Sequence, residues 1–191
     1  HFRNLLNNSQ PVIFDVGAYV GDTIKQFNSS FPECYIHAFE PFHDSFSFLK
    51  NRFKKTDKIF LNNIAVGDRS LENIKMYVTQ NKGSSSLLQP TIGANEFWEG
   101  NPLSTQKEVK VETITIDKYC EQHNIERIDI LKIDVQGNEL KVLQGAKRML
   151  KEKRVSLIFT EISIAPNYKE QSEIDEVIKL LRENKYRIFN F

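Results

Sequence analysis

Glycines and an acidic residue follow two short apolar runs of this sequence in a pattern that could bind a nucleoside. Residues 15–21 read Asp-Val-Gly-Ala-Tyr-Val-Gly and close the apolar run Val12–Val16. Gly17 and Gly21 allow the backbone to turn sharply and to approach a ligand closely. Glu40 follows Gly17 by 23 positions, about the spacing at which a carboxylate takes the ribose hydroxyls of a bound nucleoside. This arrangement predicts a nucleoside-containing cofactor.

The spacing of the glycines distinguishes between two cofactors of that kind. Dinucleotide sites use G-x-G-x-x-G, in which close glycines admit a pyrophosphate, whereas this chain has G-x-x-x-G with Tyr19 between the glycines. The Tyr side chain leaves less room for a pyrophosphate but tolerates a methionine tail. No Tyr is followed four residues later by Lys, so the usual short-chain reductase pair is missing as well. The predicted cofactor is therefore S-adenosylmethionine, with S-adenosylhomocysteine as its product.

Two further carboxylates are candidates for a catalytic base. Asp134 follows the apolar run Ile128–Ile133, and Glu161 lies near the end of the run Val155–Ile162. Methyl transfer is an in-line displacement that depends on alignment, and a hydroxyl acceptor must also lose its proton to a base. Lys132 lies two residues before Asp134 and so on the same strand face, where it pairs with a carboxylate in either a catalytic or a structural role. A divalent metal shared by the two carboxylates is an alternative, but no metal-binding residue is predicted.

Strand-like runs alternate with helical patterns along the chain, which predicts an α/β fold with a mainly parallel, doubly wound sheet. In such sheets ligands bind at the carboxyl ends of the strands, where the residues above are expected. The predicted strands are Val12–Val16, Tyr35–Phe39, Ile59–Val66, Ile128–Ile133, Val155–Ile162 and Arg187–Phe191. The predicted helices start near Asp22, cover 42–53 and 140–150, and include Ile174 to Leu181 with Ser172 and Asp175 as a capping pair.

An insert of about 71–114 interrupts this alternation within a single predicted domain of residues 1–191. Residues 71–78 and 107–114 alternate apolar and polar side chains, which predicts a pair of half-exposed strands. The intervening stretch is rich in Gly, Ser, Asn and Pro, and connectors of this length are often binding loops or lids. Phe97 and Trp98 in this loop are candidates to cover the site.

The bulk composition narrows the partners and the compartment. The chain has 191 residues, 40% hydrophobic and 27% charged, with a net charge of +1. It offers no strongly basic surface that would attract nucleic acid, and it contains no apolar run of the ~20 residues needed to span a membrane. Cys34 and Cys120 are isolated and are expected to be reduced thiols. These features predict a cytoplasmic protein with a small-molecule or glycan acceptor, and they do not indicate an oligomeric state.

Six stretches, taken in order, resemble the FkbM family of S-adenosylmethionine-dependent methyltransferases over nearly the whole chain. The most specific is ILKIDVQGNELKVLQGA at 130–146. The others are VIFDVGAYVGDT (12–23), HAFEP (37–41), NNIAVGD (62–68), GSSSLL (83–88) and VETITID (111–117). The resemblance implies a Rossmann-like class I methyltransferase fold and O-methylation of a sugar, a glycan or a small-molecule natural product.

The resemblance also implies roles for individual residues. Asp15, Gly17, Ala18 and Gly21 would surround the methionine part of the cofactor, Glu40 would bind the ribose, and Ile64-Ala65 would flank the adenine. The whole expected cofactor set is Asp15, Gly17, Ala18, Tyr19, Gly21, Thr23, Glu40, Pro41, Asn63, Ile64, Ala65, Ser85 and Asp134. Asp134, Glu161 and Lys132 form the expected catalytic set.

The chain departs from the family pattern in three places. Tyr19 stands where Asn is usual, so a polar contact to the cofactor is lost or replaced. Gln136 stands where Glu is common, and no catalytic role is assigned to it. The family's domain usually runs on beyond Phe191, so a last edge strand is expected to be missing.

Two other functions are compatible with the cofactor motif. One is a nucleic-acid or protein methylase, although the amino-methylase signature of Asp or Asn followed by Pro-Pro-Tyr or Phe is absent. The nearest match, at 165–168, lacks both the first residue and the second proline. The other is a catalytically idle module that binds the cofactor, against which the intact Asp15, Glu40 and Asp134 argue.

Overall fold

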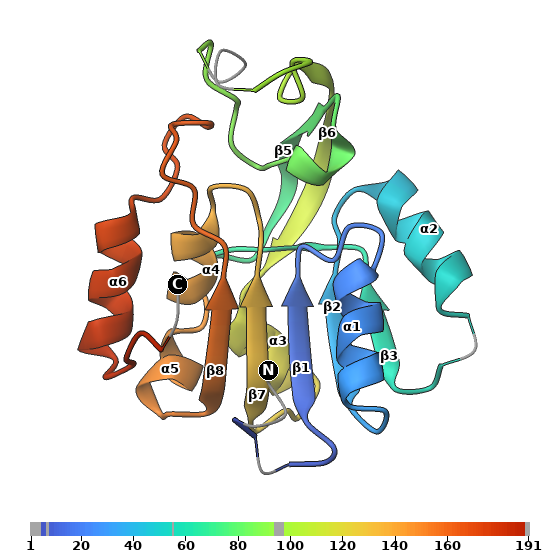
Figure 1. Cartoon of the computed structure of the whole chain (residues 1–191), viewed down its shortest axis with the longest axis vertical. Coiled ribbons are helices and arrows are strands. Elements are labelled where there is room, and N and C mark those ends of the chain that lie inside the picture. The colour runs from blue at the N-terminus through green and yellow to red at the C-terminus, as the bar shows by residue number, and fades with distance from the viewer. Residues whose placement is uncertain (1–4, 7, 55, 94–97, 190–191) are drawn as a thin grey trace.

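A computed structural model describes residues 5–6, 8–54, 56–93 and 98–189. A five-stranded sheet forms its centre, in the order β3-β2-β1-β7-β8 and with every neighbouring pair parallel (Figure 1). The central strands are β1 (Val12–Val16), β2 (Tyr35–Phe39), β3 (Ile59–Asn62), β7 (Ile128–Ile133) and β8 (Val155–Thr160). The helices are α1 (Asp22–Ser30), α2 (His43–Arg52), α3 (Ile116–Gln122), α4 (Glu139–Gln144), α5 (Lys147–Lys151) and α6 (Ile174–Glu183).

The order of the strands reverses between β1 and β7. From β1 the chain winds outward through β2 to β3, and it then returns to β7 on the other side of β1 and continues to β8. Asp15 pairs with Lys132 and Val16 with Ile133 across this junction. Ligands of doubly wound sheets bind at the carboxyl edge beside such a reversal, so the fold places the Asp15–Gly21 motif where a cofactor is expected.

Apolar side chains cover both faces of the sheet, as a parallel sheet requires. On one face, Ile24 and Phe27 of α1 and Leu49 of α2 pack with Ile13, Ile36 and Ile130. On the other face, buried side chains of α3 to α6 pack against Phe14, Leu131 and Ile133. All six residues of β7 are buried, including Asp129 and Lys132, and the four Ile and Leu residues predict the strand from the sequence. The predicted doubly wound architecture is confirmed.

The predicted strand Ile59–Val66 is divided in the structure. β3 ends at Asn62, and β4 (Ala65–Val66) belongs to a second sheet of order β4-β6-β5. The break follows from two side-chain amides: Asn62 Nδ2 donates to the carbonyl of Ala38, and Asn63 Nδ2 donates to those of Glu40 and Pro41. These bonds end the ladder with β2 and redirect the chain toward the second sheet.

The insert forms the antiparallel pair that its alternating pattern predicts. β5 (Leu71–Thr79) and β6 (Thr105–Ile114) pair antiparallel, and β6 also pairs in parallel with β4. A short 3-10 turn, η2 (Lys82–Ser84), follows β5. Figure 1 shows that the pair rises above the arrowheads of the central strands, so the insert overhangs the carboxyl edge.

The predicted helix 140–150 is also divided, into α4 and α5, with Gly145 at the junction. A Cβ atom placed on Gly145 would lie 2.0 Å from the backbone oxygen of Gly67. The helix therefore changes direction where it packs directly against the loop after β4. Only glycine allows this approach, because any side chain would overlap the Gly67 carbonyl.

Two predictions near the C-terminus were wrong in detail. Glu173 and Glu176, rather than Ser172 and Asp175, form the capping box of α6, because the Ser172 hydroxyl is bonded to the Gly137 carbonyl and the Leu140 N–H. Residues 187–189 are not in a strand, and 190–191 lie outside the described residues. The Tyr186 hydroxyl donates to the Val155 carbonyl, so a side chain rather than a ladder fixes this segment.

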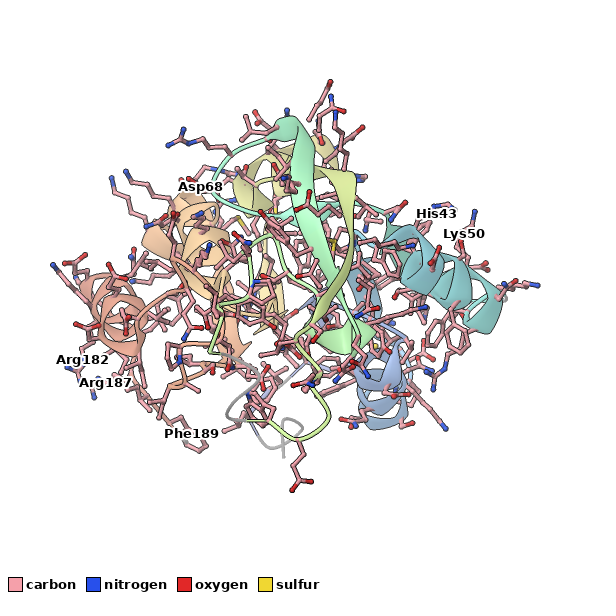
Figure 2. The ribbon with its side chains drawn as sticks, turned by 90° about the horizontal axis from the view of Figure 1, so that it is seen from above. His43, Lys50, Asp68, Arg182, Arg187 and Phe189 are labelled. Carbon is pink, nitrogen blue, oxygen red and sulfur yellow. The ribbon has the colours of Figure 1, made fainter. Side chains whose placement is uncertain are left out.

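Helix α2 and the C-terminal segment lie at opposite ends of the molecule (Figure 2). Seen from above, His43 and Lys50 of α2 lie on the opposite side of the molecule from Arg182, Arg187 and Phe189 (Figure 2).

Within the described ranges, no helix is long and apolar enough to cross a bilayer.

Candidate functional site

The turn after β1 lies directly against the end of β7. Gly17 has φ +83°, and a Cβ atom there would lie 1.8 Å from the backbone oxygen of Asp134. The N–H groups of Gly17 and Ala18 both donate to the carbonyl of Phe39, at 3.1 and 3.0 Å. The ends of β1, β2 and β7 are thus tied together by the main chain. This contact explains why position 17 is a glycine.

Glu40 is a buried carboxylate held by two main-chain donors. Its Oε2 accepts from the N–H of Tyr19 at 2.8 Å, and its Oε1 accepts from the N–H of Phe42 at 2.9 Å. The residue is only 6% exposed, and burial raises the pKa of its carboxyl to about 7. The two bonds fix the carboxylate between the turn after β1 and the start of α2.

A pocket opens beside Glu40 at the carboxyl edge of the sheet. About 720 Å³ of space lies between its walls, including open solvent at its mouth. We call it the cofactor pocket. Predicted residues in its lining are Gly17, Tyr19, Glu40, Pro41, Ile64, Ala65, Ser85 and Asp134.

Residues of the insert form another part of this lining. Met76 of β5, Lys82 and Gly83 of η2, and Leu87 reach the pocket. The ring of Tyr19 lies beside Gly83, because a Cβ atom there would be 3.5 Å from the ring. The turn after β1 therefore contacts the insert, and the cofactor pocket lies between the sheet edge and the insert.

A buried lysine lies beneath the turn. Nζ of Lys132 is 3.0 Å from Oδ1 of Asp15 and 3.6 Å from Oδ2 of Asp134, and it donates to the carbonyl of Gly17 at 2.7 Å. Asp15 and the Lys132 side chain are almost inaccessible. Burial raises the pKa of the Asp15 carboxyl, and the ammonium opposes that rise. Loss of either partner would leave a buried uncompensated charge, so the pair holds the turn in place.

Gln136 connects the two candidate bases. Its Nε2 donates to Oδ1 of Asp134 at 2.9 Å and to Oε2 of Glu161 at 3.1 Å, while its Oε1 accepts from the Tyr168 hydroxyl at 3.1 Å. Asp134 raises the pKa of Glu161 to about 7 through a shared hydrogen bond, and burial adds to that rise. Gln136 therefore holds the two carboxylates close together.

A second hollow adjoins the cofactor pocket at Gln136, which lines both. We call it the Trp98 hollow, and its walls are η2, the loop before β6 and the segments after β7 and β8. Trp98 Nε1 donates to Asn167 Oδ1 at 3.0 Å. The polar and aromatic side chains in its lining are Asn81, Ser84, Trp98, Glu139, Glu161, Ser163, Asn167 and Tyr168.

The comparison with protein families identifies the domain. The methyltransferase FkbM domain matches residues 15–188 of this chain. The chain belongs to the FkbM methyltransferase family.

Two methyltransferases are similar to most of the chain. It is 28% identical over 186 residues to the 2-O-methyltransferase NoeI of Sinorhizobium fredii, in a match that covers 93% of this chain and 74% of NoeI. It is 25% identical over 174 residues to the hexuronic acid methyltransferase AglP of Haloferax volcanii, in a match that covers 91% of this chain and 62% of AglP. The chain therefore spans less than two thirds of AglP.

A solved structure has the same fold. The crystal structure of methyltransferase FkbM from Methylobacillus flagellatus superposes with a TM-score of 0.54 at 17% identity. The match covers 81% of this chain and 34% of that one. This agreement confirms the Rossmann-like methyltransferase fold.

Several residues predicted for the site do not line the cofactor pocket. Gly21 packs against Leu49 and Phe53, which a Cβ atom there would meet at 2.7 and 2.5 Å. Asn63 is exposed and secures the end of β2 through its amide. Those outside the lining of the cofactor pocket are Asp15, Ala18, Gly21, Thr23, Asn63, Lys132 and Glu161, of which Glu161 lines the Trp98 hollow.

The lid prediction falls partly outside the described residues. Phe97 is among the residues that the structure does not describe, whereas Trp98 lines the Trp98 hollow and not the cofactor pocket.

Among the residues that are described, no group of three or more His, Cys, Asp or Glu side chains is placed to hold a metal ion.

Proposed function

We propose that this FkbM methyltransferase transfers a methyl group from S-adenosylmethionine to a hydroxyl group of a saccharide. Family membership supports methyl transfer, and Glu40 supports the cofactor. A carboxylate offers about four lone-pair sites, of which the N–H groups of Tyr19 and Phe42 occupy two. The others are available for a pair of ribose hydroxyls. The fixed position of Glu40 in the pocket wall is the observation that carries this proposal.

The remaining lining suits the other parts of the cofactor. Ile64, Ala65 and Met76 offer an apolar surface for an adenine ring. Gly17 brings the main chain up to the pocket without a side chain, which suits the methionine tail. When bound, the cofactor supplies an electrophilic methyl group on a sulfonium.

Glu161 is the proposed general base. Glu161 would accept the proton of the acceptor hydroxyl as the hydroxyl oxygen took the methyl group, which the bound cofactor would supply and from which S-adenosylhomocysteine would leave. A pKa of about 7 suits this role, because a base is most effective when its pKa lies near the working pH. Gln136 connects Asp134 to Glu161, and Lys132 positions Asp134 from behind. In this scheme Asp134 and Lys132 position the site, and Glu161 moves the proton.

The relatives support a saccharide acceptor. AglP is named for methylation of a hexuronic acid, which is a sugar acid, and NoeI for methylation of a 2-hydroxyl oxygen. A balanced net charge of +1 gives no electrostatic reason to expect a nucleic-acid acceptor. A hydroxyl of a sugar ring is the acceptor that these observations favour.

Titration calorimetry with S-adenosylhomocysteine tests the cofactor assignment. The chain should bind it, and Glu40→Ala should weaken binding by at least about 100-fold, because it removes the hydroxyl acceptor and leaves two buried N–H groups unpaired. Glu121→Ala, an exposed change on α3, is the matched control and should bind normally. Thermal melts establish that each variant folds. A folded wild-type chain that does not bind S-adenosylhomocysteine would exclude the proposed function.

A further inference from the structure

The Trp98 hollow has the position expected of an acceptor site. It meets the cofactor pocket at Gln136, whose amide holds Asp134 on one side and Glu161 on the other. An acceptor in this hollow would place a hydroxyl beside the proposed base while the cofactor occupies its own pocket.

Trp98 offers a stacking surface within the hollow. Its indole N–H is bonded to Asn167, and Asn167 Nδ2 donates in turn to Ser163 Oγ at 3.0 Å. These bonds fix the orientation of the ring, while 48% of the residue remains exposed. A held aromatic face beside hydroxyl and amide groups suits a sugar ring, which has apolar C–H faces and a polar rim.

Carboxylates supply the charge in the described lining of the hollow. The described lining residues include no Lys, Arg or His, and the segments that form the walls contribute Glu99, Asp134, Glu139 and Glu161. Of these carboxylates, Glu139 and Glu161 line the hollow itself.

The nearest cations along the chain contact groups outside the described lining of the hollow. Lys132 is buried between Asp15 and Asp134, Lys169 donates to Gln89, and Lys82 faces the ring of Phe42. A carboxylate on the acceptor would therefore meet like charge in the described lining, which contains no Lys, Arg or His.

We propose that the Trp98 hollow binds the acceptor and accepts an uncharged sugar residue while it rejects uronic acids. This inference rests on the proposed function, since it names the acceptor of that reaction. It separates this chain from its relative AglP, which is named for a hexuronic acid. Like charges brought together in a partly dry site oppose binding strongly, and the stacking surface is indifferent to charge.

Trp98 itself provides the measurement, because it is the only tryptophan of the chain. The full chain is saturated with S-adenosylhomocysteine, and Trp98 emission is followed during titration with matched methyl glycosides. The pairs are glucoside and glucuronide, galactoside and galacturonide, and mannoside and mannuronide. The neutral members should alter the emission with Kd values at least about tenfold lower than those of their uronic acids. Added salt should reduce this ratio.

Ser84 offers a matched pair of variants. It lines the hollow from η2, so Ser84→Lys adds a cation there and Ser84→Gln adds similar bulk without charge. Ser84→Lys should bring the ratio of Kd values to about 1 or below, and Ser84→Gln should leave it above about tenfold. Unchanged binding of S-adenosylhomocysteine shows that both variants fold.

Three results would contradict the inference in different ways. Equal or tighter binding of uronic acids by the wild-type chain would overturn the charge selectivity. Emission that responds to none of the glycosides, in a chain that binds S-adenosylhomocysteine, would overturn the assignment of the hollow. Failure to bind S-adenosylhomocysteine at all would overturn the proposed function instead.

Discussion

The cofactor pocket and the Trp98 hollow lie side by side but are held in different ways. The cofactor pocket is fixed by main-chain contacts at strand ends, such as those from Gly17 and Ala18 to Phe39. The Trp98 hollow depends on side-chain bonds between loops, including Trp98 to Asn167 and Tyr168 to Gln136.

This difference suits two kinds of ligand. A site made from strand ends varies little when loop side chains change, so it suits a constant cofactor. A site made from loops can change its ligand by a few substitutions without disturbing the sheet. If the cofactor binds in one region and the acceptor in the other, substitutions in the cofactor pocket should alter cofactor binding, and substitutions in the Trp98 hollow should alter acceptor binding.

The largest expected effect comes from Gly17→Ala. Its Cβ would overlap the Asp134 carbonyl at 1.8 Å, in addition to the cost of φ +83°. We expect the free energy of unfolding to fall by at least about 3 kcal/mol and binding of S-adenosylhomocysteine to be lost. Gly100→Ala is the control, because Gly100 has φ +78° with no atom within 4 Å of the added Cβ. It should cost only about 1 kcal/mol in chemical denaturation. Equal losses would show that main-chain contact does not fix the cofactor pocket.

The second largest expected effect comes from Glu161→Gln, which changes a side chain where the cofactor pocket and the Trp98 hollow meet. It should lower the rate of methyl transfer by about 100-fold, because the general base is lost. The wild-type rate should rise with pH and level off above about 7, since Glu161 must be deprotonated to act and its pKa is about 7. The variant should lack this rise and still bind S-adenosylhomocysteine. A normal rate in the variant would exclude Glu161 as the base.

The smallest effect is the pH dependence of cofactor affinity. The free Glu40 carboxyl has a pKa of about 7, and its ionised form is the better acceptor for ribose hydroxyls. Affinity for S-adenosylhomocysteine should therefore increase about tenfold from pH 6 to pH 8, with a proton released on binding. Calorimetry in buffers of different ionisation enthalpy detects that proton. Glu40→Gln should abolish the dependence, and an affinity that falls with pH would contradict the assignment.

The fold was largely predictable because its signals are local. The buried strands β1, β2 and β7 are apolar runs with the bounds that the structure has, and the pattern of the insert predicts β5 and β6. The errors arose where tertiary contacts act. Side-chain amides of Asn62 and Asn63 divide one predicted strand, and Gly145 divides one helix against Gly67.

The sequence predicts residues for the cofactor side of the candidate site in more detail than for the acceptor side. Gly17 and Glu40 are identified by their spacing, because the β-α-β topology fixes where the ends of β1 and β2 lie. Met76 and Leu87 carry no such signal, since they reach the pocket only because the insert overhangs the edge. The role of Gln136 was missed because it depends on bonds to Glu161 and Tyr168, 25 and 32 residues away.

Glu40 links two main-chain segments before any ligand binds, and this affects the thermodynamics of binding. Because its two oxygens already hold the N–H groups of Tyr19 and Phe42, the turn after β1 and the start of α2 are ordered before any ligand arrives. Most of the conformational entropy of this wall is therefore lost during folding rather than during association. Cofactor binding should then carry a small entropic penalty from the protein.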